Sequence, residues 1–531
     1  PPTPPPPPPP PTPILAALAA AAGRIRAPFF CPGHKQGAFP PIPGPTPGEE
    51  HLAGSGRKDG FGSARGRRDD AALPWRLDLP EIPDFDSLDR PGGAIKEAQE
   101  LAAETFGAGV EVETFFLVNG STAGVVASVM AAVAAVGAGG AGDAGLAPRV
   151  AVPRAVHVSA VHGLVLAGAV PVFVEPVAEL ARGIVHGVTP AGVRAALERE
   201  DAEGGKGTLA AVLVVSPTYH GVLADIAGIA AVAHEFGAPL VVDEAHGAHL
   251  GGVGLRGGAD VVVQSTHKTL PALTQAAMMH VRKGGRVAAG DVARALRLVQ
   301  STSPSALLLG SLDAARAAVA GEEGARRLEA VVRLGERANA ELGAIPGVEV
   351  LSEVPRGMAA LDPTRVTVFV AGLGVDGFEL DERLIEEFGV YAELPTASHI
   401  TFILTMGNTA ADVDLLVSAF RQLSAELFSP SSAPAEEAPG SSATDAGAPS
   451  RPPQVMTPRA AFFSAVEAVA GAAAVGRVSA AAVCPYPPGI PVLMPGEEVT
   501  EACVEEIRAV LAAGGEVTGC EADGSLLVVK Q

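Results

Sequence analysis

The sequence predicts an α/β protein whose large domain contains a mostly parallel, doubly wound sheet. Short apolar runs rich in β-branched residues alternate with helical segments between residues 91 and 310. The clearest expected strands are Leu209–Val215, Leu240–Val242 and Val261–Val263. Strands that alternate with helices at this spacing are typical of parallel sheets, and ligands then bind beyond the carboxyl ends of the strands. The residues that follow these strands are therefore the first candidates for function.

A single lysine follows the strand Val261–Val263. The chain leaves this apolar run through Gln264–His267 and reaches Lys268, with little charge around it. Partial burial would lower the pKa of the amine and make the neutral nucleophile available, as Schiff-base chemistry requires. A surface lysine after an edge strand would produce the same local pattern. This stretch alone does not separate the two interpretations.

An aspartate ends the preceding apolar strand, Leu240–Val242. Asp243 and Lys268 thus stand at the ends of two expected strands of one sheet. An acid and a lysine in such positions are the groups that pyridoxal 5'-phosphate requires. The lysine forms the Schiff base, and the acid keeps the pyridine nitrogen protonated so that the ring can accept electrons. The pair therefore predicts a site for this cofactor.

A turn rich in glycine and hydroxyl groups lies upstream. It joins an expected strand at Thr114–Val118 to an expected helix at Val125–Val136, and it contains Ser121 and Thr122. Backbone N–H groups at a helix N-terminus, together with hydroxyl groups, suit a phosphate. A Ser or Thr N-cap after a glycine turn is common by itself, so the turn supports a phosphate site only in combination with the other motifs.

The remaining pattern divides the chain into six segments. Further helices are expected at Ile14–Arg26, Ala94–Phe106, Ile226–Phe236 and Glu322–Leu342, and further strands at Val150–Val152, Val170–Val174, Val366–Val370 and His399–Leu404. Pattern and composition predict a polyproline tail at 1–13, an N-terminal segment with a disordered insertion at 14–90, a cofactor-binding large domain at 91–310, a small α/β domain at 311–428, a disordered linker at 429–458 and a C-terminal α+β module at 459–531.

Composition and charge exclude several classes of protein. The formal net charge of −21 opposes binding to nucleic acid, which needs a basic surface. The four cysteines lack the paired spacing of a zinc site and are typical of reduced intracellular thiols. No apolar run reaches transmembrane length without glycine, proline or charge, so no membrane partner is expected. We expect an intracellular protein, in the cytoplasm or a plastid. A chain that begins with polyproline and without Met is expected to derive from a longer precursor, although no targeting segment is visible.

The segment Asp243–His246 allows two other interpretations. Its letters, DEAH, also occur in helicases, but the chain has no GxxxxGK[ST] loop upstream. Asp243, His246 and His249 could be proposed as metal ligands. Their side-chain directions on a turn after a strand are undetermined, and we expect no metal.

Seven short motifs occur in order along the chain, between Phe29 and about Glu498. They are PGHKQG, FFLVNGST, SPTYHG, VVDEAHGAH, QSTHKTL, STSPS and YPPGIPVLMPGE. In these motifs the chain resembles the ornithine/lysine/arginine decarboxylase family, of the aspartate-aminotransferase-like fold type I. The resemblance implies a pyridoxal-phosphate-dependent carboxy-lyase that converts a basic L-amino acid, arginine or lysine ahead of ornithine, to an amine for polyamine synthesis. It also implies a homodimer or a higher assembly with shared active sites.

The resemblance also assigns roles to individual residues. Lys268 would hold the cofactor, Asp243 would pair with the pyridine nitrogen, and His157 would stack on the ring. The other cofactor contacts that it implies are Ser121, Thr122, Ser265 and His267 at the phosphate, His246, and Thr302 reaching the phosphate of the neighbouring subunit. Lys268 or His267 would return a proton to the substrate.

The substrate side of the site is less defined by sequence. Glu497 lies in the apolar segment PPGIPVLMPG and should be partly buried, so it needs a cationic partner. The distal cation of a basic amino acid is a candidate for that partner. The family usually has a lysine after the stacking histidine, where this chain has Val158. This departure leaves an inactive homologue that binds the cofactor as an alternative. Another reaction on the same cofactor, such as aminotransfer or aldol cleavage, is a second alternative.

Overall fold

The structure is a computed structural model. It describes residues 10–24, 77–82, 85–138, 147–179, 182–202, 208–429, 452–486, 491–512, 516–521 and 523–530. Several sequence predictions lie outside these ranges. They are most of the polyproline tail, the segment Phe29–Gly37, the glycine- and arginine-rich insertion, and most of the linker predicted at 429–458.

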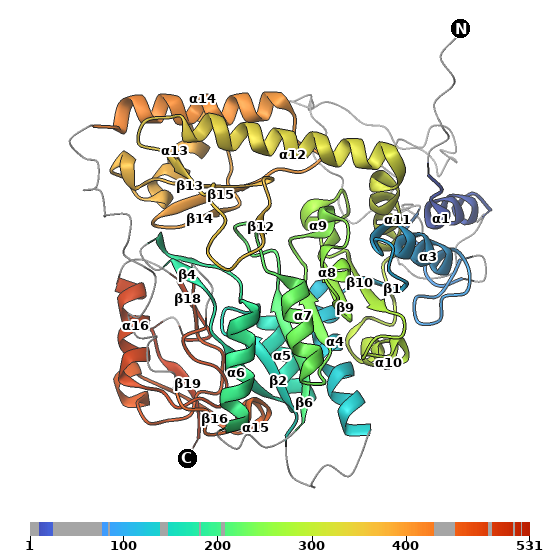
Figure 1. Cartoon of the computed structure of the whole chain (residues 1–531), viewed down its shortest axis with the longest axis horizontal. Helices are drawn as coiled ribbons and strands as arrows, with labels where there is room; N and C mark the ends of the chain where they lie inside the picture. Colours follow the sequence, from blue (N-terminus) through green and yellow to red (C-terminus); the bar gives the residue numbers. More distant parts are fainter. Residues whose placement is uncertain are drawn as a thin grey trace, which may run out of the picture.

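A seven-stranded sheet forms the centre of the large domain (Figure 1), in the order β1-β10-β9-β8-β6-β2-β3. The strands are β1 (Val112–Leu117), β10 (Ala277–Arg282), β9 (Val261–Gln264), β8 (Leu240–Asp243), β6 (Leu209–Val215), β2 (Arg149–Pro153) and β3 (Val170–Val174). Neighbours from β9 to β3 pair in parallel, whereas β10 runs antiparallel to both β9 and β1. The predicted mostly parallel sheet is confirmed. The sequence did not indicate β10, because its segment AMMHVR holds one β-branched residue and no strong alternation.

Helices cover both faces of this sheet, as expected for a doubly wound fold. One core lies between the sheet and α4 (Gly120–Ala138), α5 (Val158–Ala167) and α10 (Ala289–Val299). A second core lies under α6 (Pro190–Ala202) and α7 (Ile226–Glu235) on the opposite face. Among the described helices, α4 alone is long and apolar enough to cross a membrane, and half of that stretch is buried, as in a core helix. Apolar burial on both faces fixes the sheet, and with it the edge at which its strands end.

The small domain is built on an antiparallel sheet in the order β11-β13-β15-β14. Its strands are β11 (Glu349–Val350), β13 (Arg365–Phe369), β15 (His399–Ile403) and β14 (Leu394–Pro395). The helices α12 (Gly321–Gly343), α13 (Gly377–Phe388) and α14 (Ala410–Leu427) cover it, and the two long ones run across the top of Figure 1. A short pair, β12 (Ala360–Leu361) with β7 (Val222–Leu223), joins this domain to the large one. The small domain therefore sits over the loops that follow the central strands.

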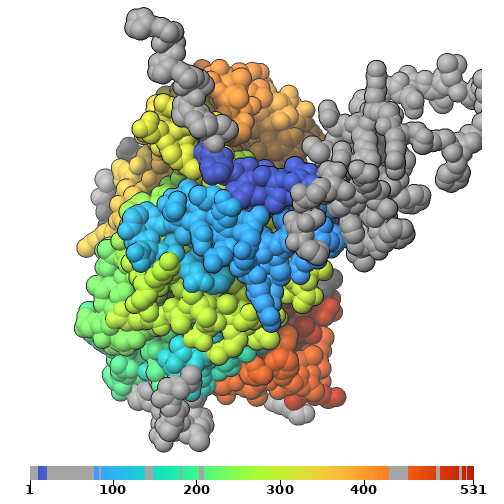
Figure 2. All heavy atoms as spheres, turned by 90° about the vertical axis from the view of Figure 1, so that its right-hand side faces the viewer, coloured from blue at the N-terminus to red at the C-terminus, as the bar shows by residue number. Residues whose placement is uncertain are grey.

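The N-terminal helix α1 (Pro13–Arg24) lies across α3 (Ala94–Phe106) and α11 (Ala306–Val319). Figure 2 shows α1 in dark blue against α3 in lighter blue. Two buried charged residues hold it. Asp313 accepts a hydrogen bond from Ile14 N at 2.9 Å, and Arg316 donates to Pro11 O at 2.5 Å. Asp313 and Arg316 also pair with each other, so the helix start is tied to the large domain by groups that water does not reach.

The C-terminal module has its own apolar core. Its elements are α15 (Pro458–Phe463), β16 (Val466–Val469), β17 (Cys484–Tyr486), α16 (Glu501–Ala512), β18 (Glu516–Thr518) and β19 (Leu526–Val529). Arg459 donates to Leu166 O at 2.8 Å, at the end of α5. Figure 1 shows the module, in red, at the lower left of the molecule, where α15 packs against α5.

Candidate active site

The candidate site lies where loops leave the carboxyl ends of the central strands. β8 and β9 are parallel neighbours, with Asp243 beside Val263 in the ladder. β9 then leads through Ser265 into α9 (Thr266–Thr269), which carries Lys268. Because neighbouring parallel strands end at the same edge, Asp243 and Lys268 are brought together although the sequence separates them.

Lys268 is half-buried, and the side chain of His246 lies close to its amine. Its Nζ atom lies 3.1 Å from His246 Nε2. Burial lowers the pKa of the amine, and the positive charge of Arg365 lowers it further, while the carboxylates of Asp243 and Glu393 act in the opposite direction. Burial wins, so the neutral amine is more available than on a surface lysine, which is the state a nucleophilic amine needs.

Asp243 is buried at the end of β8, with 4% of its surface exposed. Its Oδ1 atom accepts a hydrogen bond from Ala245 N at 3.1 Å. Burial raises the pKa of the carboxyl, while the charges of His157 and Lys268 oppose this. In the part of the chain that the structure describes, no arginine or lysine lies within ion-pair distance of it. A buried carboxylate of this kind suits a cationic ring nitrogen, which would stabilise its ionised form.

Two histidines stand near this pair. His157 caps α5, where its Nδ1 atom accepts a hydrogen bond from Ser159 N at 3.2 Å. The His157 side chain is exposed in the single chain. Desolvation by the surrounding protein nevertheless lowers the pKa of its imidazole, the charge of Asp243 opposes this shift, and that of Lys268 adds to it. His246 is buried, its pKa lies well below the usual value because of burial, and its ring packs against Tyr219 with centroids 4.6 Å apart. Both imidazoles are therefore neutral at physiological pH.

The hydroxyl groups predicted at the phosphate converge from two elements. Ser121, at the start of α4, lies with its Oγ atom 2.7 Å from Ser265 Oγ, after β9. Thr122 is exposed on the first turn of the same helix. His267 Nδ1 lies 2.9 Å from Ala276 O, so that this atom is turned back toward β10. Hydroxyls beside a helix N-terminus are a suitable cradle for a phosphate.

The comparison with known protein families agrees with this geometry. Residues 12–412 match the family described as Orn/Lys/Arg decarboxylase, major domain, and residues 442–523 match its C-terminal domain. The chain belongs to the Orn/Lys/Arg decarboxylase family.

Relatives and solved structures support the same assignment. The arginine decarboxylase of Bacillus subtilis is 35% identical over 519 residues, covering 96% of this chain and 95% of that protein. That of Halalkalibacterium halodurans is 36% identical over 493 residues, covering 91% and 93%. The structure of the constitutive lysine decarboxylase of Escherichia coli matches with a TM-score of 0.74 at 20% identity, covering 98% of this chain and 82% of the other. The protein is thus a carboxy-lyase of basic amino acids, and the solved structure supports the fold.

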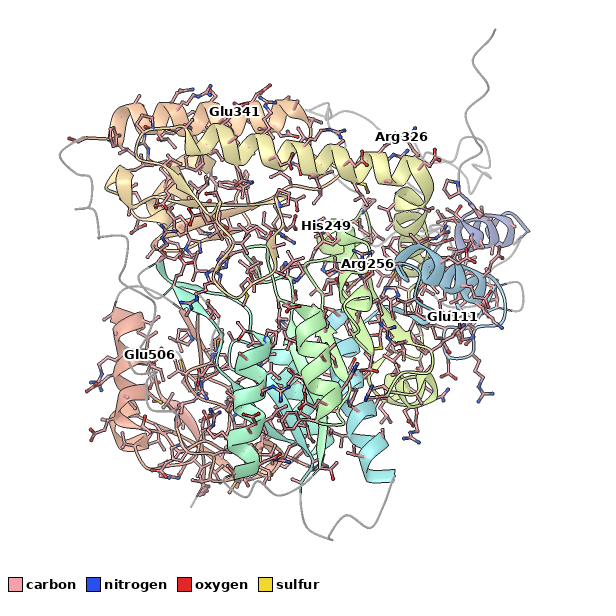
Figure 3. All side chains as sticks on the ribbon, in the orientation of Figure 1. Glu111, His249, Arg256, Arg326, Glu341 and Glu506 are labelled. Atoms are coloured by element: carbon pink, nitrogen blue, oxygen red, sulfur yellow. The ribbon has the colours of Figure 1, made fainter. Side chains whose placement is uncertain are left out.

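The decarboxylase does not form the metal site considered at Asp243, His246 and His249. His249 Nε2 lies 2.8 Å from Asp362 Oδ2 and 3.1 Å from Thr364 Oγ1, toward the small domain. Figure 3 labels His249 at this junction. Among the described residues, no group of three histidine, cysteine or acidic side chains could hold a metal ion. His249 instead helps to join the two domains.

Glu497 occupies a different environment from the one expected. It is buried, as predicted, with 1% of its surface exposed. Its cationic partner is Arg154, which donates to Oε1 at 2.7 Å and to Oε2 at 2.9 Å. Met494 N also donates to Oε2 at 2.8 Å. The carboxylate is already neutralised within the chain, which corrects the expectation that a substrate cation pairs with it.

Thr302 lies in an exposed loop near the cofactor-binding turn. Ser301 N donates to Asn119 Oδ1 at 3.0 Å, which places this loop beside the start of α4 in its own chain. The side chain of Thr302 is exposed. It is therefore free to contact a neighbouring subunit, and its role across an interface stays a prediction.

Three residues of the site were missed by sequence reasoning. Arg365 is buried at the start of β13 and donates a hydrogen bond to His246 O at 3.1 Å. Its Nε and Nη1 atoms have no hydrogen-bond partner among the described residues. Tyr219 donates from its hydroxyl to Glu393 Oε1 at 2.6 Å. Tyr219 belongs to the motif SPTYHG, but nothing in the sequence indicated that Glu393, far along the chain, would meet it.

Proposed function

We propose that this decarboxylase acts on L-arginine and uses pyridoxal 5'-phosphate. The observation that carries the proposal is the position of a half-buried Lys268 amine beside His246, with the buried carboxylate of Asp243 at the adjacent strand end. The relatives that cover more than nine tenths of this chain are arginine decarboxylases. A lysine decarboxylase of Pseudomonas aeruginosa is 28% identical and is covered over 68% of its length. These relatives favour arginine over lysine.

The residues present fit the cofactor. Lys268 would hold it covalently, and Asp243 would face the ring nitrogen. Ser121, Thr122, Ser265 and His267 would surround the phosphate, and His157 would lie against the ring. The cofactor supplies an electron sink that accepts the electrons of the broken bond between Cα and the carboxylate.

Arg365 and His246 control the proton on Lys268. The fixed charge of Arg365 favours the neutral amine. His246, kept neutral by burial, accepts a hydrogen bond from Lys268 Nζ at its Nε2 atom. This bond aims the amine, because the imidazole is itself held against Tyr219. A neutral, oriented amine is the form that attacks a carbonyl carbon.

Lys268 also suits the last proton transfer. When carbon dioxide has left, Cα of the substrate takes up a proton. We assign this donation to Lys268 and not to His267, because His267 Nδ1 is occupied by Ala276 O and its ring would face the phosphate. A general acid transfers protons most efficiently when its pKa lies near the working pH. The pKa of Lys268 is lowered by burial, which brings it closer to neutral pH.

We further propose that two chains share the active sites. Thr302 would extend from its exposed loop to the phosphate held by the neighbouring subunit. The exposure of the Thr302 side chain supports this, since it leaves the residue accessible to a neighbouring subunit. A cofactor held across the interface would then link its own retention to dimer stability.

Product analysis tests the proposed reaction. Purified protein supplied with the cofactor should release carbon dioxide from arginine faster than from lysine or ornithine, and should form the corresponding amine without keto acid. Keto acid without carbon dioxide would indicate aminotransfer. Neither product from any of the three substrates would contradict the proposal.

A further inference from the structure

One buried acid beside the site has no role in the reaction described above. Glu244 follows Asp243 directly, and 1% of its surface is exposed. Its Oε2 atom accepts a hydrogen bond from Gln264 Nε2 at 2.8 Å, and its Oε1 atom accepts one from Gly254 N at 3.2 Å. Gln264 ends β9, and Gly254 lies in α8 (Val253–Arg256). A single carboxylate therefore joins two separate segments of the chain.

These two segments carry the two groups that meet at the reacting amine. His246 lies in the loop between Glu244 and α8, and the hydrogen bond to Gly254 closes the base of this loop. Lys268 lies in α9, a few residues after Gln264. The Nζ atom of Lys268 and the Nε2 atom of His246 are 3.1 Å apart. The Glu244 carboxylate is thus bonded to both supports of the contact that aims the amine.

The loop folds closely over the Glu244 side chain. A Cβ atom at Gly247 would lie 2.7 Å from Glu244 Cγ, and Gly247 N donates to Glu244 O at 2.9 Å. A Cβ atom at Gly254 would lie 2.9 Å from Val262 Cγ2, in β9. Glycine at these two positions lets the backbone come within hydrogen-bond distance of the carboxylate.

The amide of Gln264 is itself oriented by buried partners. Its Oε1 atom lies 3.1 Å from His280 Nε2, in β10, and His280 Nδ1 lies 2.8 Å from Thr114 Oγ1, in β1. Burial lowers the pKa of His280 to about 3, so the ring is neutral. Since the Gln264 nitrogen donates to Glu244, its oxygen accepts from His280 Nε2, and His280 Nδ1 accepts from Thr114. The buried network of Thr114, His280, Gln264 and Glu244 is therefore satisfied, and a satisfied buried network is rigid.

The two donors also favour the ionised form of Glu244. Burial raises the pKa of this carboxyl to about 7, while the hydrogen bonds from Gln264 and Gly254 and the charge of Arg256 oppose the rise. A buried carboxylate that loses a donor is destabilised more than an exposed one, because water does not replace the lost bond. The loop and the strand end are therefore held together more firmly than by hydrogen bonds at a surface.

We propose that Glu244 is a positioning residue for the reaction, which holds the loop of His246 against the turn of Lys268 so that the imidazole aims the amine. The proposal rests on the role of Lys268 in the function proposed above. Displacing a reacting group by about 1 Å can slow a reaction on the order of a hundredfold. Glu244 therefore acts on the rate of the chemical steps and not on the affinity for the substrate.

Exchanging the amide and the carboxylate tests this role. In Glu244→Gln a single oxygen faces two donors, so one of the hydrogen bonds to Gln264 and Gly254 is lost. In the double variant Glu244→Gln/Gln264→Glu, the new amide donates to the new carboxylate and accepts from Gly254 N, and His280 keeps an acceptor. The double variant thus restores every hydrogen bond and moves the charge by one side chain. Thr114→Val removes only the far end of the buried network and is the matched control.

Two rates are measured in the full chain. The first is kcat for arginine, recorded together with KM. The second is the rate at which the visible absorption of the cofactor returns after the cofactor has been removed and added back at saturation. This second rate reports the attack by Lys268 and needs no substrate. Urea unfolding measures the stability of each variant.

For Glu244→Gln we expect both rates to fall by about tenfold to a hundredfold. KM for arginine should stay within about twofold of the wild type, because the substrate contacts are unchanged. The double variant should recover most of both rates. Gln264→Met removes the donor to Oε2 and should also lower both rates, which decides the question if Glu244→Gln does not fold. Thr114→Val should lower stability but keep both rates within about twofold of the wild type.

Three results would overturn the assignment. They are unchanged rates in folded Glu244→Gln, no recovery in a folded double variant, and equal losses in Thr114→Val, since the network would then act through stability alone. Failure of the proposed function looks different, because the wild type then releases no carbon dioxide from arginine, lysine or ornithine. The return of the visible absorption still separates the variants in that case. If the wild type lacks this absorption too, Lys268 does not hold the cofactor and the role of Glu244 is refuted with it.

Discussion

Lys268 Nζ lies 3.1 Å from His246 Nε2, where the loops after β9 and β8 meet. This contact joins a nucleophilic amine to an imidazole that burial keeps neutral. An imidazole without charge accepts a hydrogen bond from the amine without repelling it. The arrangement therefore orients Lys268 while leaving its low pKa intact.

Lys268→Ala should abolish both the visible absorption of the bound cofactor and nearly all turnover, because none of the other lysines that the structure describes lies at these strand ends. Borohydride reduction followed by peptide mapping should place the label on Lys268 in the wild type. Lys283→Ala, which removes an exposed lysine, is the control and should behave as the wild type. A Lys268→Ala protein that still carries cofactor reducible by borohydride would refute the assignment.

Asp243→Asn should retain some cofactor but lose turnover by about a hundredfold to a thousandfold. The substitution keeps the shape and removes the charge that stabilises a protonated ring nitrogen. The measurement is kcat with cofactor at saturation, with thermal unfolding to verify the fold. Turnover equal to that of the wild type in a folded variant would eliminate this role for Asp243.

Mixing two inactive variants tests whether subunits share the site. Lys268→Ala removes the reacting amine, and Thr302→Arg blocks the exposed loop. A dimer with one chain of each kind would contain one intact site, so a fraction of the activity should return. Subunit exchange is verified with differently tagged chains. If exchange occurs and no activity returns, Thr302 does not act across the interface.

Arg154→Met should destabilise the protein by about 3–5 kcal/mol, because it leaves the buried carboxylate of Glu497 without a partner. The guanidinium also donates to Pro491 O and Val492 O, so the loss should begin with release of the C-terminal module. Urea unfolding and limited proteolysis measure both effects. Arg333→Met, which breaks an exposed pair with Glu329, should cost about 1 kcal/mol or less. Equal effects in the two variants would contradict the anchoring role.

Acid should weaken the contact between the large and small domains at His220 and His399. Their Nε2 atoms lie 3.0 Å apart, a contact that requires at least one neutral ring to accept the hydrogen bond. Burial lowers the pKa of His220 to about 3, with His399 adding to the effect, and burial lowers that of His399 to about 4. Because both folded pKa values lie below the unfolded value of about 6.5, the unfolded chain binds more protons in acid. The contribution of the two neutral histidines to the free energy of unfolding is complete above pH 6.5 and is lost as the pH falls toward 4.

Urea unfolding at pH 7 and pH 5 measures the effect of these histidines. The wild type should lose more stability between the two pH values than His399→Gln does. His162→Gln, which changes an exposed histidine, should follow the wild type. Equal losses in wild type and His399→Gln would show that the pair does not titrate as proposed.

Much of the large domain could be predicted from local sequence. The strands β3 (Val170–Val174) and β6 (Leu209–Val215) begin and end where the apolar runs do, and α3 matches its predicted bounds, Ala94–Phe106. β-Branched runs favour strands, and the abrupt change to polar residues marks where each strand ends. Asp243 and Lys268 could be placed for the same reason, since Asp243 ends one such run and Lys268 follows another after the polar segment Gln264–His267.

Tertiary structure alone decided the partners of the charged groups. Tyr219 and Glu393 come from different domains, as do Arg154 and Glu497, and each pair meets only because the domains pack together. A buried carboxylate needs a cation, and sequence can predict that need, as it did for Glu497. Sequence cannot predict which cation satisfies it, because the free energy depends on distance and desolvation in the folded chain. For that reason the sequence determined the reacting lysine and its acid, and the packing of the domains determined which partner each of the other carboxylates meets.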